Sequence, residues 1–170
     1  MQRDASGYVL SAEEGEGLWF LGTLLTIKAG GPQTGGALTV VEQLAPPGFG
    51  PPRHLHRWED EAFYILEGQL TVSCGDRTWL ADRGAFIWLP RGIAHSFVVS
   101  SAAPARLLQI TAPAQFERFA AEVGEPAGQR ALPPPAAPDL PRLREAMARY
   151  GYELAELPGS GPAHSARHQS

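Results

Sequence analysis

Two histidines near the middle of the chain, His54 and His56, are separated by a single residue. In an extended strand, residues two apart point to the same face, so both imidazoles can reach one ion without distortion of the backbone. Three acidic residues follow, Glu59, Asp60 and Glu61. Histidines with a nearby carboxylate suit a divalent transition metal that keeps open coordination positions. The stretch therefore predicts a metal site that needs a further ligand from elsewhere in the chain.

The segments around these residues predict short strands separated by turns. The chain has 170 residues, of which 44% are hydrophobic, with 19 glycines and 16 prolines. Such a composition, with turn signals every several residues, is typical of an all-β sandwich or barrel, and a barrel offers a concave interior for a ligand. We predict strands over 18–29 (one or two), 37–45, 62–66, 70–74, 78–81, 85–89, 95–100 and 106–111.

The sequence changes character after Ala112. Apolar residues at helical spacing predict an amphipathic helix over 114–123. A proline-rich linker follows, and then a second helix over 139–154 that Asp139 caps. We divide the chain into an N-terminal arm (1–17), a barrel (18–112), a helical and proline-rich extension (113–157) and a disordered tail (158–170), and we do not expect the tail's His164 and His168 to be ligands.

Several function classes are disfavoured by the composition. The net charge is −4 with a pI near 5.7, and no basic stripe for nucleic acid is present. No apolar run has the length of a signal peptide or a membrane span. The single cysteine, Cys74, excludes an intrachain disulfide. We therefore expect a cytoplasmic protein that binds neither nucleic acid nor membranes.

A second glycine-bounded segment, GAFIWLPRGIAH, ends at His95. Together the two segments resemble the paired motifs of the cupin superfamily. The first motif, G-x5-H-x-H-x4-E-x6-G, begins at Gly48 and ends at Gly68, with His54, His56 and Glu61 in register. The second, G-x5-P-x-G-x2-H-x3-N, fits Gly84, Pro90, Gly92 and His95 and departs from the pattern at its last position, where Val99 replaces asparagine.

The resemblance covers roughly residues 18–112 and implies a single-domain cupin. Its expected fold is a small jelly-roll barrel, or double-stranded β-helix, followed by short C-terminal helices. It implies one divalent transition metal per chain (Fe, Ni, Mn, Co, Cu or Zn) held by His54, His56, Glu61 and His95. The usual asparagine is not a metal ligand in the family, so Val99 leaves the site intact. We expect Glu59 and Asp60 to be solvated loop charges.

Strand parity then suggests which residues line a pocket beside the metal. Phe63 and Ile65 share the parity of Glu61, and Phe97 and Val99 share that of His95. Trp88 is a further candidate, as are Phe20, Phe49 and Phe86. These side chains predict an apolar, partly aromatic cavity that suits a flat organic molecule with few polar groups.

The flanks LLTIKAGGPQTGGALTVVE and FERFAAEVGEPA resemble bacterial quercetin 2,3-dioxygenase-type cupins. That resemblance implies an oxidoreductase, a dioxygenase that cleaves a flavonol or another enolic aromatic with O2, with Glu61 as both metal ligand and catalytic base. Three alternatives stay open. The first is a non-oxidative isomerase, cyclase or lyase acting on a polyketide-like or enolisable molecule, and the second is a metal-containing small-molecule binding protein. The third is a barrel without a metal, which stoichiometric metal in the purified protein would exclude. A homodimer is expected, because the barrel family commonly pairs barrels.

Overall fold

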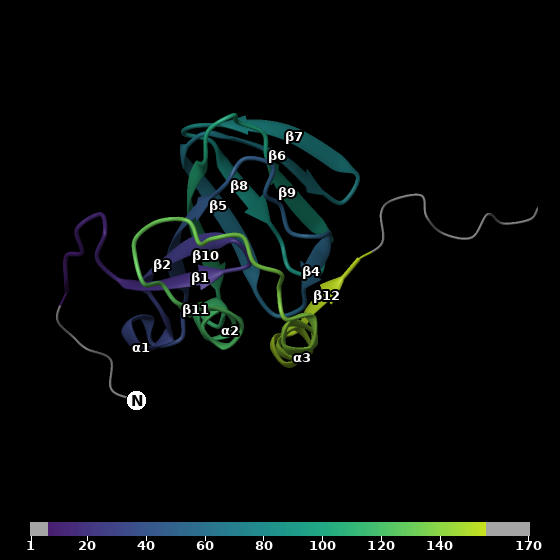
Figure 1. Cartoon of the computed structure of the whole chain (residues 1–170). Coiled ribbons are helices and arrows are strands. Elements are labelled where there is room, and N and C mark those ends of the chain that lie inside the picture. Colours follow the sequence, from purple (N-terminus) through teal and green to yellow (C-terminus); the bar gives the residue numbers. More distant parts are fainter. Residues whose placement is uncertain (1–6, 156–170) are drawn as a thin grey trace, which may run out of the picture.

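Two antiparallel β-sheets form the body of the protein in a computed structural model that describes residues 7–155 (Figure 1). The larger sheet has the order β11-β1-β2-β3-β10-β5-β8 and the smaller has the order β12-β4-β9-β6-β7. The larger comprises β11 (Glu125–Pro126), β1 (Glu16–Phe20), β2 (Thr23–Ala29), β3 (Thr39–Ala45), β10 (Ala105–Ala112), β5 (Asp60–Glu67) and β8 (Phe86–Leu89). The smaller comprises β12 (Tyr152–Leu154), β4 (His54–His56), β9 (His95–Val99), β6 (Gln69–Cys74) and β7 (Arg77–Asp82). The predicted all-β fold is confirmed.

Strict alternation along the central strands builds the core between the sheets. In β3 and β10 every second residue is buried, as expected for strands with one face toward the core. The barrel core consists of apolar side chains from both sheets. They include Ile65, Leu70, Val72, Val99 and Leu107, each at most 2% exposed. Burial of these side chains holds the sheets together and therefore positions the strands that carry the predicted ligands.

The short strand β4 is fixed beside β9 by the segment that precedes it. His54 pairs with His95 across the two strands. The backbone amide of Gly48 donates to the Val99 carbonyl at 3.0 Å, and the Val99 amide donates to the Phe49 carbonyl at 2.8 Å. A Cβ on Gly50 would lie 2.1 Å from the Phe97 carbonyl oxygen, so only glycine allows this approach.

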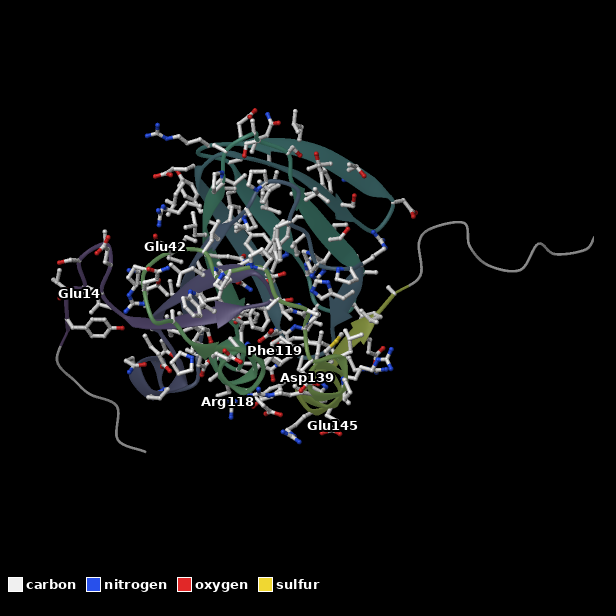
Figure 2. The ribbon with its side chains drawn as sticks, viewed as in Figure 1. Glu14, Glu42, Arg118, Phe119, Asp139 and Glu145 are labelled. Carbon is white, nitrogen blue, oxygen red and sulfur yellow. The ribbon has the colours of Figure 1, made fainter. Side chains whose placement is uncertain are left out.

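Within residues 7–155, three helices accompany the sheets: α1 (Gly31–Thr34), which lies between the predicted strands 18–29 and 37–45, α2 (Phe116–Val123) and α3 (Leu140–Tyr150). Phe119, labelled in Figure 2, is buried with Phe116 between α2 and the larger sheet and packs on Phe20 with its ring centre 5.6 Å away. Asp139, also labelled there, caps α3 by accepting from the Arg142 amide at 3.1 Å. Both C-terminal helices were predicted, but their bounds differ.

The second helix was predicted over 139–154, but its last predicted residues form a strand instead. The chain leaves α3 at Gly151, whose left-handed φ of 72° ends the helix. Residues Tyr152–Leu154 then form β12, which pairs antiparallel with β4. The reason is tertiary, because β4 offers an open edge that these residues complete.

Some expectations lie outside this description. The predicted tail at 158–170, with His164 and His168, is beyond the described residues. Among residues 7–155, no helix is long and apolar enough to cross a membrane. The boundaries assigned to the arm, barrel and extension stay predictions.

Replacement of a core leucine should destabilise the fold far more than the same replacement at the surface. Leu107 is fully buried in the barrel core, whereas Leu80 on β7 is 62% exposed. We expect Leu107→Ala to lower the free energy of unfolding by about 2–5 kcal/mol, because it leaves a cavity. Leu80→Ala should change it by less than about 0.5 kcal/mol. Urea unfolding followed by circular dichroism measures both, and equal losses would contradict this packing.

Candidate metal centre

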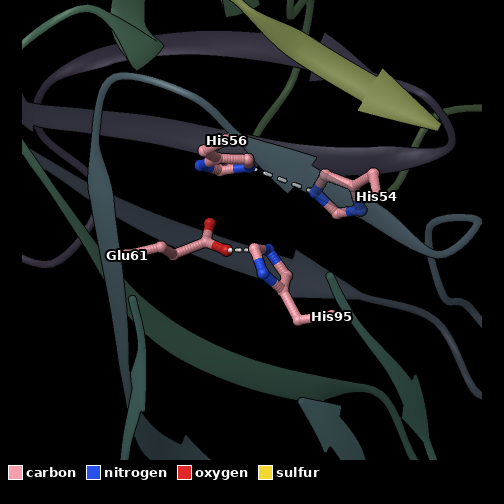
Figure 3. Close-up of side chains that lie close together, drawn as sticks. All are labelled: His54, His56, Glu61 and His95. Carbon is pink, nitrogen blue, oxygen red and sulfur yellow. Dashed lines mark hydrogen bonds and ion pairs between the residues drawn. The ribbon is translucent and has the colours of Figure 1, made fainter. Parts of the chain in front are cut away.

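Four polar side chains converge at one end of the barrel (Figure 3). His54 and His56 come from β4, Glu61 from β5 and His95 from β9. One ligand atom from each lies within 4.8 Å of every other. The Nε2 atoms of His54 and His56 are 3.1 Å apart, and His95 Nε2 lies 3.2 Å from Glu61 Oε2. The structure thus brings together the four residues that the motifs singled out.

The backbone orients two of the three imidazoles. His54 Nδ1 lies 2.9 Å from the Pro52 carbonyl oxygen, and His95 Nδ1 lies 2.9 Å from the carbonyl oxygen of Ile93. Because a carbonyl can only accept, each Nδ1 carries the proton and donates it. Each Nε2 is therefore left with a lone pair directed at the centre of the cluster.

The carboxylate of Glu61 is held in its charged form. Gln109 on β10 donates its amide Nε2 to Glu61 Oε1 at 2.6 Å. Burial alone would raise the pKa of Glu61, but His56 and the contact with His95 outweigh burial and lower the pKa to about 2. Burial, with His95 and His56 close by, lowers the pKa of His54 to about 4. At neutral pH the site therefore presents an anionic oxygen and at least one neutral imidazole.

This donor set fits a divalent transition metal ion. Three borderline imidazole nitrogens with one hard carboxylate oxygen suit Fe, Ni, Mn, Co, Cu or Zn, and they leave room for an exchangeable ligand. Within residues 7–155, the buried His95 Nε2 has no hydrogen-bond partner of good geometry. Buried polar atoms are normally paired, so an unpaired nitrogen aimed into a cluster of lone pairs indicates a place for a cation.

The acidic run differs from its sequence-based interpretation. Glu59 was expected to be a solvated loop charge, but it is fully buried, with Oε1 3.3 Å from His56 Nδ1. It also accepts a hydrogen bond from the Tyr152 hydroxyl. Asp60 is partly exposed but pairs with Arg91, Oδ2 to Nη2 at 2.6 Å. Neither is a free loop charge, because partners remote in sequence cover them.

A pocket of about 340 Å³ adjoins the cluster, and His54, His56 and Glu61 form part of its wall. Most of the remaining wall is apolar. Its aromatic rings come from both sheets, from α2 and from the loop before β4; they are Phe20, Phe49, Phe63, Phe97, Phe116, Phe119 and Tyr152. The volume lies in the range of small-molecule sites. Helix α3 contributes Leu140, Leu143, Arg144 and Met147.

Four pocket residues were suggested by strand parity and Trp88 was a further candidate; two of these five line the pocket and three do not. Phe63 and Phe97 line the pocket, but Ile65 and Val99 lie deeper in the barrel core. They have the expected parity but sit one layer further from the metal end. Trp88 is 55% exposed, because β8 turns Ile87 and Leu89 inward and leaves Trp88 on the outer face.

Sequence reasoning missed several residues around the site. Gln109 and Gln43 occupy inward positions of β10 and β3, and both line the pocket. A polar residue at a buried position of an alternating strand is a usable signal, which these two glutamines provide. Tyr152 carried no such signal, since its strand was predicted as the end of a helix.

Comparison with known proteins supports the same assignment. The cupin domain model matches residues 40–111. The chain is 26% identical to quercetin 2,3-dioxygenase of Bacillus subtilis over 167 residues, which are 98% of this chain and 49% of that protein. It therefore spans about half the length of this curated relative.

Two solved structures show the same fold. A predicted oxalate decarboxylase from Thermotoga maritima has a TM-score of 0.57 at 17% identity, covering 63% of this chain and 99% of its own. An RmlC-like cupin from Shewanella frigidimarina has a TM-score of 0.54 at 18% identity, covering 66% of this chain and 96% of its own. The two-sheet fold and the motif residues agree with the match of residues 40–111 to the cupin domain model, so this part of the chain has the features of a cupin domain.

Proposed function

We propose that the protein is a metal-dependent dioxygenase that cleaves a flavonol-like or other enolic aromatic molecule with O2. One observation carries the proposal: three members of the four-residue cluster, His54, His56 and Glu61, form part of the wall of an apolar, largely aromatic pocket. The distant relationship to a quercetin 2,3-dioxygenase over 98% of the chain supports the reaction class. Because the chain covers about half of that relative, substrate and activity are inferences.

The pocket suits a flat, weakly charged substrate. Phe63 and Phe97 pack with their ring centres 5.3 Å apart next to the cluster, so they can hold an aromatic ring by edge and face contacts. Among the lining residues outside the cluster, Arg144 on α3 is the one with a charged side chain, and the others are apolar or uncharged. Apolar walls also exclude water, which strengthens every electrostatic interaction at the cluster.

Glu61 is the residue we assign to proton transfer. When bound, a divalent metal lowers the pKa of a coordinated hydroxyl, which makes an enol proton easier to remove at neutral pH. Glu61 is ionised, since its pKa is lowered to about 2, and it lies in the pocket wall with Gln109 fixing Oε1. Its other oxygen faces the cluster and can accept the substrate proton.

Two further expectations stay predictions. A homodimer is supported by exposed aromatic side chains on the outer face of β5 and β8, where Tyr64 and Phe86 pair across the strands and Trp88 follows. Contiguous exposed apolar side chains mark interaction sites more often than isolated ones do. A cytoplasmic location is the other expectation.

Metal binding should depend on the imidazole that β9 supplies. We expect about one divalent transition metal per chain by elemental analysis of the purified protein, and a large loss in His95→Ala. His164→Ala, the same change at a histidine outside both motifs, should retain the metal. Circular dichroism checks that both variants are folded. Equal metal content in wild type and His95→Ala would remove His95 from the ligand set.

Oxygen consumption distinguishes the proposed reaction from its alternatives. With flavonols or related enols, we expect O2 uptake matched by substrate loss, and no product under strict anaerobiosis. Product formed without O2 would instead identify the non-oxidative isomerase, cyclase or lyase. Tight ligand binding with no turnover in air would identify a binding protein.

The role of Glu61 can be tested by a change that keeps its shape. Glu61→Gln should lower kcat by about 10²–10⁴-fold, the usual contribution of a positioned general base. Glu67→Gln is the matched control, because Glu67 lies on the same strand but its side chain is 64% exposed. Metal content is measured in both. Full turnover by a metal-loaded Glu61→Gln enzyme would refute the base role.

A further inference from the structure

We propose that Glu59 and Tyr152 form a clamp that positions His56 as a metal ligand, so that the C-terminal strand β12 completes the metal centre. Glu59 lies outside the four-residue cluster, and Tyr152 lies beyond the segment that matches the cupin domain model. The proposal rests on the metal-binding part of the proposed function and not on the reaction. Both are positioning residues, since they act through His56.

The first observation is the difference between His56 and the other two imidazoles. His54 and His95 each have a backbone carbonyl oxygen 2.9 Å from Nδ1. The Nδ1 atom of His56 instead faces a carboxylate, Glu59 Oε1, at 3.3 Å. All three imidazoles therefore have an oxygen atom within 3.3 Å of Nδ1, but only at His56 does this oxygen belong to a carboxyl side chain. The His56–Glu59 contact has the distance of an ion pair and lacks hydrogen-bond geometry, so the carboxyl group faces Nδ1 without a formed hydrogen bond.

The second observation is that Glu59 is held in place by a residue distant in sequence. Glu59 is fully buried and its Oε1 accepts a hydrogen bond from the Tyr152 hydroxyl. Tyr152 itself is 5% exposed, and its ring centre lies 4.4 Å from that of His56. One tyrosine thus contacts both the ligand and the carboxylate behind it.

The third observation is that the backbone fixes Tyr152 against the ligand strand. Tyr152 pairs directly with His56 in the β12–β4 ladder. The Arg57 amide donates to the Gly151 carbonyl at 2.8 Å, and the Arg57 side chain pairs with Glu153. A Cβ on Gly151 would lie 2.8 Å from the Trp58 ring, which shows how closely the turn before Tyr152 packs. The C-terminal strand is therefore built onto the strand that carries two ligands.

These contacts have a chemical consequence for Nε2. A carboxylate that accepts from Nδ1 fixes the tautomer and the ring orientation, and it makes Nε2 a stronger donor to a metal. The tyrosine hydroxyl in turn fixes the carboxylate. Loss of such a partner typically weakens metal binding by about 10- to 100-fold. A buried acid with a merely structural role would affect folding stability instead and leave metal affinity unchanged.

The test is a titration of the metal-free full chain with Co²⁺. Calorimetry and the visible absorption of bound Co²⁺ both monitor the titration and give the dissociation constant. We expect Glu59→Gln to weaken Co²⁺ binding by about 10- to 100-fold. Tyr152→Phe, which keeps the ring, should weaken it by less than Glu59→Gln does. Because Tyr152 acts through Glu59, the double variant should bind no more weakly than Glu59→Gln alone.

Matched controls keep the outcome interpretable. Glu67→Gln on β5 and Tyr150→Phe at the end of α3 make the same chemical changes away from the cluster, and both should bind Co²⁺ like the wild type. Thermal unfolding of the metal-free proteins reports stability separately. If Glu59→Gln does not fold, Tyr152→Phe decides: weaker binding by more than twofold with unchanged stability supports the clamp, and unchanged affinity overturns it.

The outcomes also separate this proposal from the preceding one. A wild-type chain that binds no Co²⁺ would overturn metal binding and the clamp together. If the wild type binds Co²⁺ and both single variants fold and bind it within twofold of the wild-type affinity, the clamp alone is overturned. Additive losses in the double variant would show that Tyr152 does not act through Glu59, and would overturn the clamp as a unit.

Discussion

The pairing of β4 with β9 is the contact on which the candidate metal centre depends. The strand β4 has three residues, and its ladder to β9 has a single pair, His54 with His95. So short a strand has little stability of its own. It is kept in place by the 48–50 segment on β9 and by β12 along its other edge. Two of the four ligands therefore owe their position to contacts outside their own strand.

The inward faces of two strands change from polar to apolar with distance from the cluster. Along β5 they run from Glu61 through Phe63 to Ile65, and along β9 from His95 through Phe97 to Val99. The first residue of each series belongs to the cluster, the second lines the pocket and the third lies in the core. The inward-facing residues of each strand thus supply a candidate metal ligand, then a pocket wall, then core packing in successive layers. The barrel is therefore filled with side chains at one end and has its pocket at the other.

Much of this arrangement could be predicted from local sequence, because it depends on local spacing. His54 and His56 share a strand face by parity, and turn residues mark nearly every strand of the barrel. Glu59 could not be placed in this way, since its burial results from Tyr152, 93 residues later. The strand containing Tyr152 was likewise hidden, because the helical pattern of the preceding residues was extended to Leu154, whereas Gly151 ends the helix. The orientation of Trp88 depended on the register of β8, which the sequence did not specify.

Charge balance connects the cluster to the residues behind it. Glu59 and Glu61 are both buried, and burial raises the pKa of Glu59; two ionised carboxylates out of contact with water would need compensating positive charge. Around His56 the competing effects are visible: burial lowers its pKa, but Glu61 and Glu59 outweigh burial and raise it. A divalent cation among the imidazoles would supply two positive charges against the two carboxylates, and His56 could then stay neutral between them. The clamp and the cluster would then form one electrostatic unit, in which the two carboxylates of Glu59 and Glu61 balance the two positive charges of the ion.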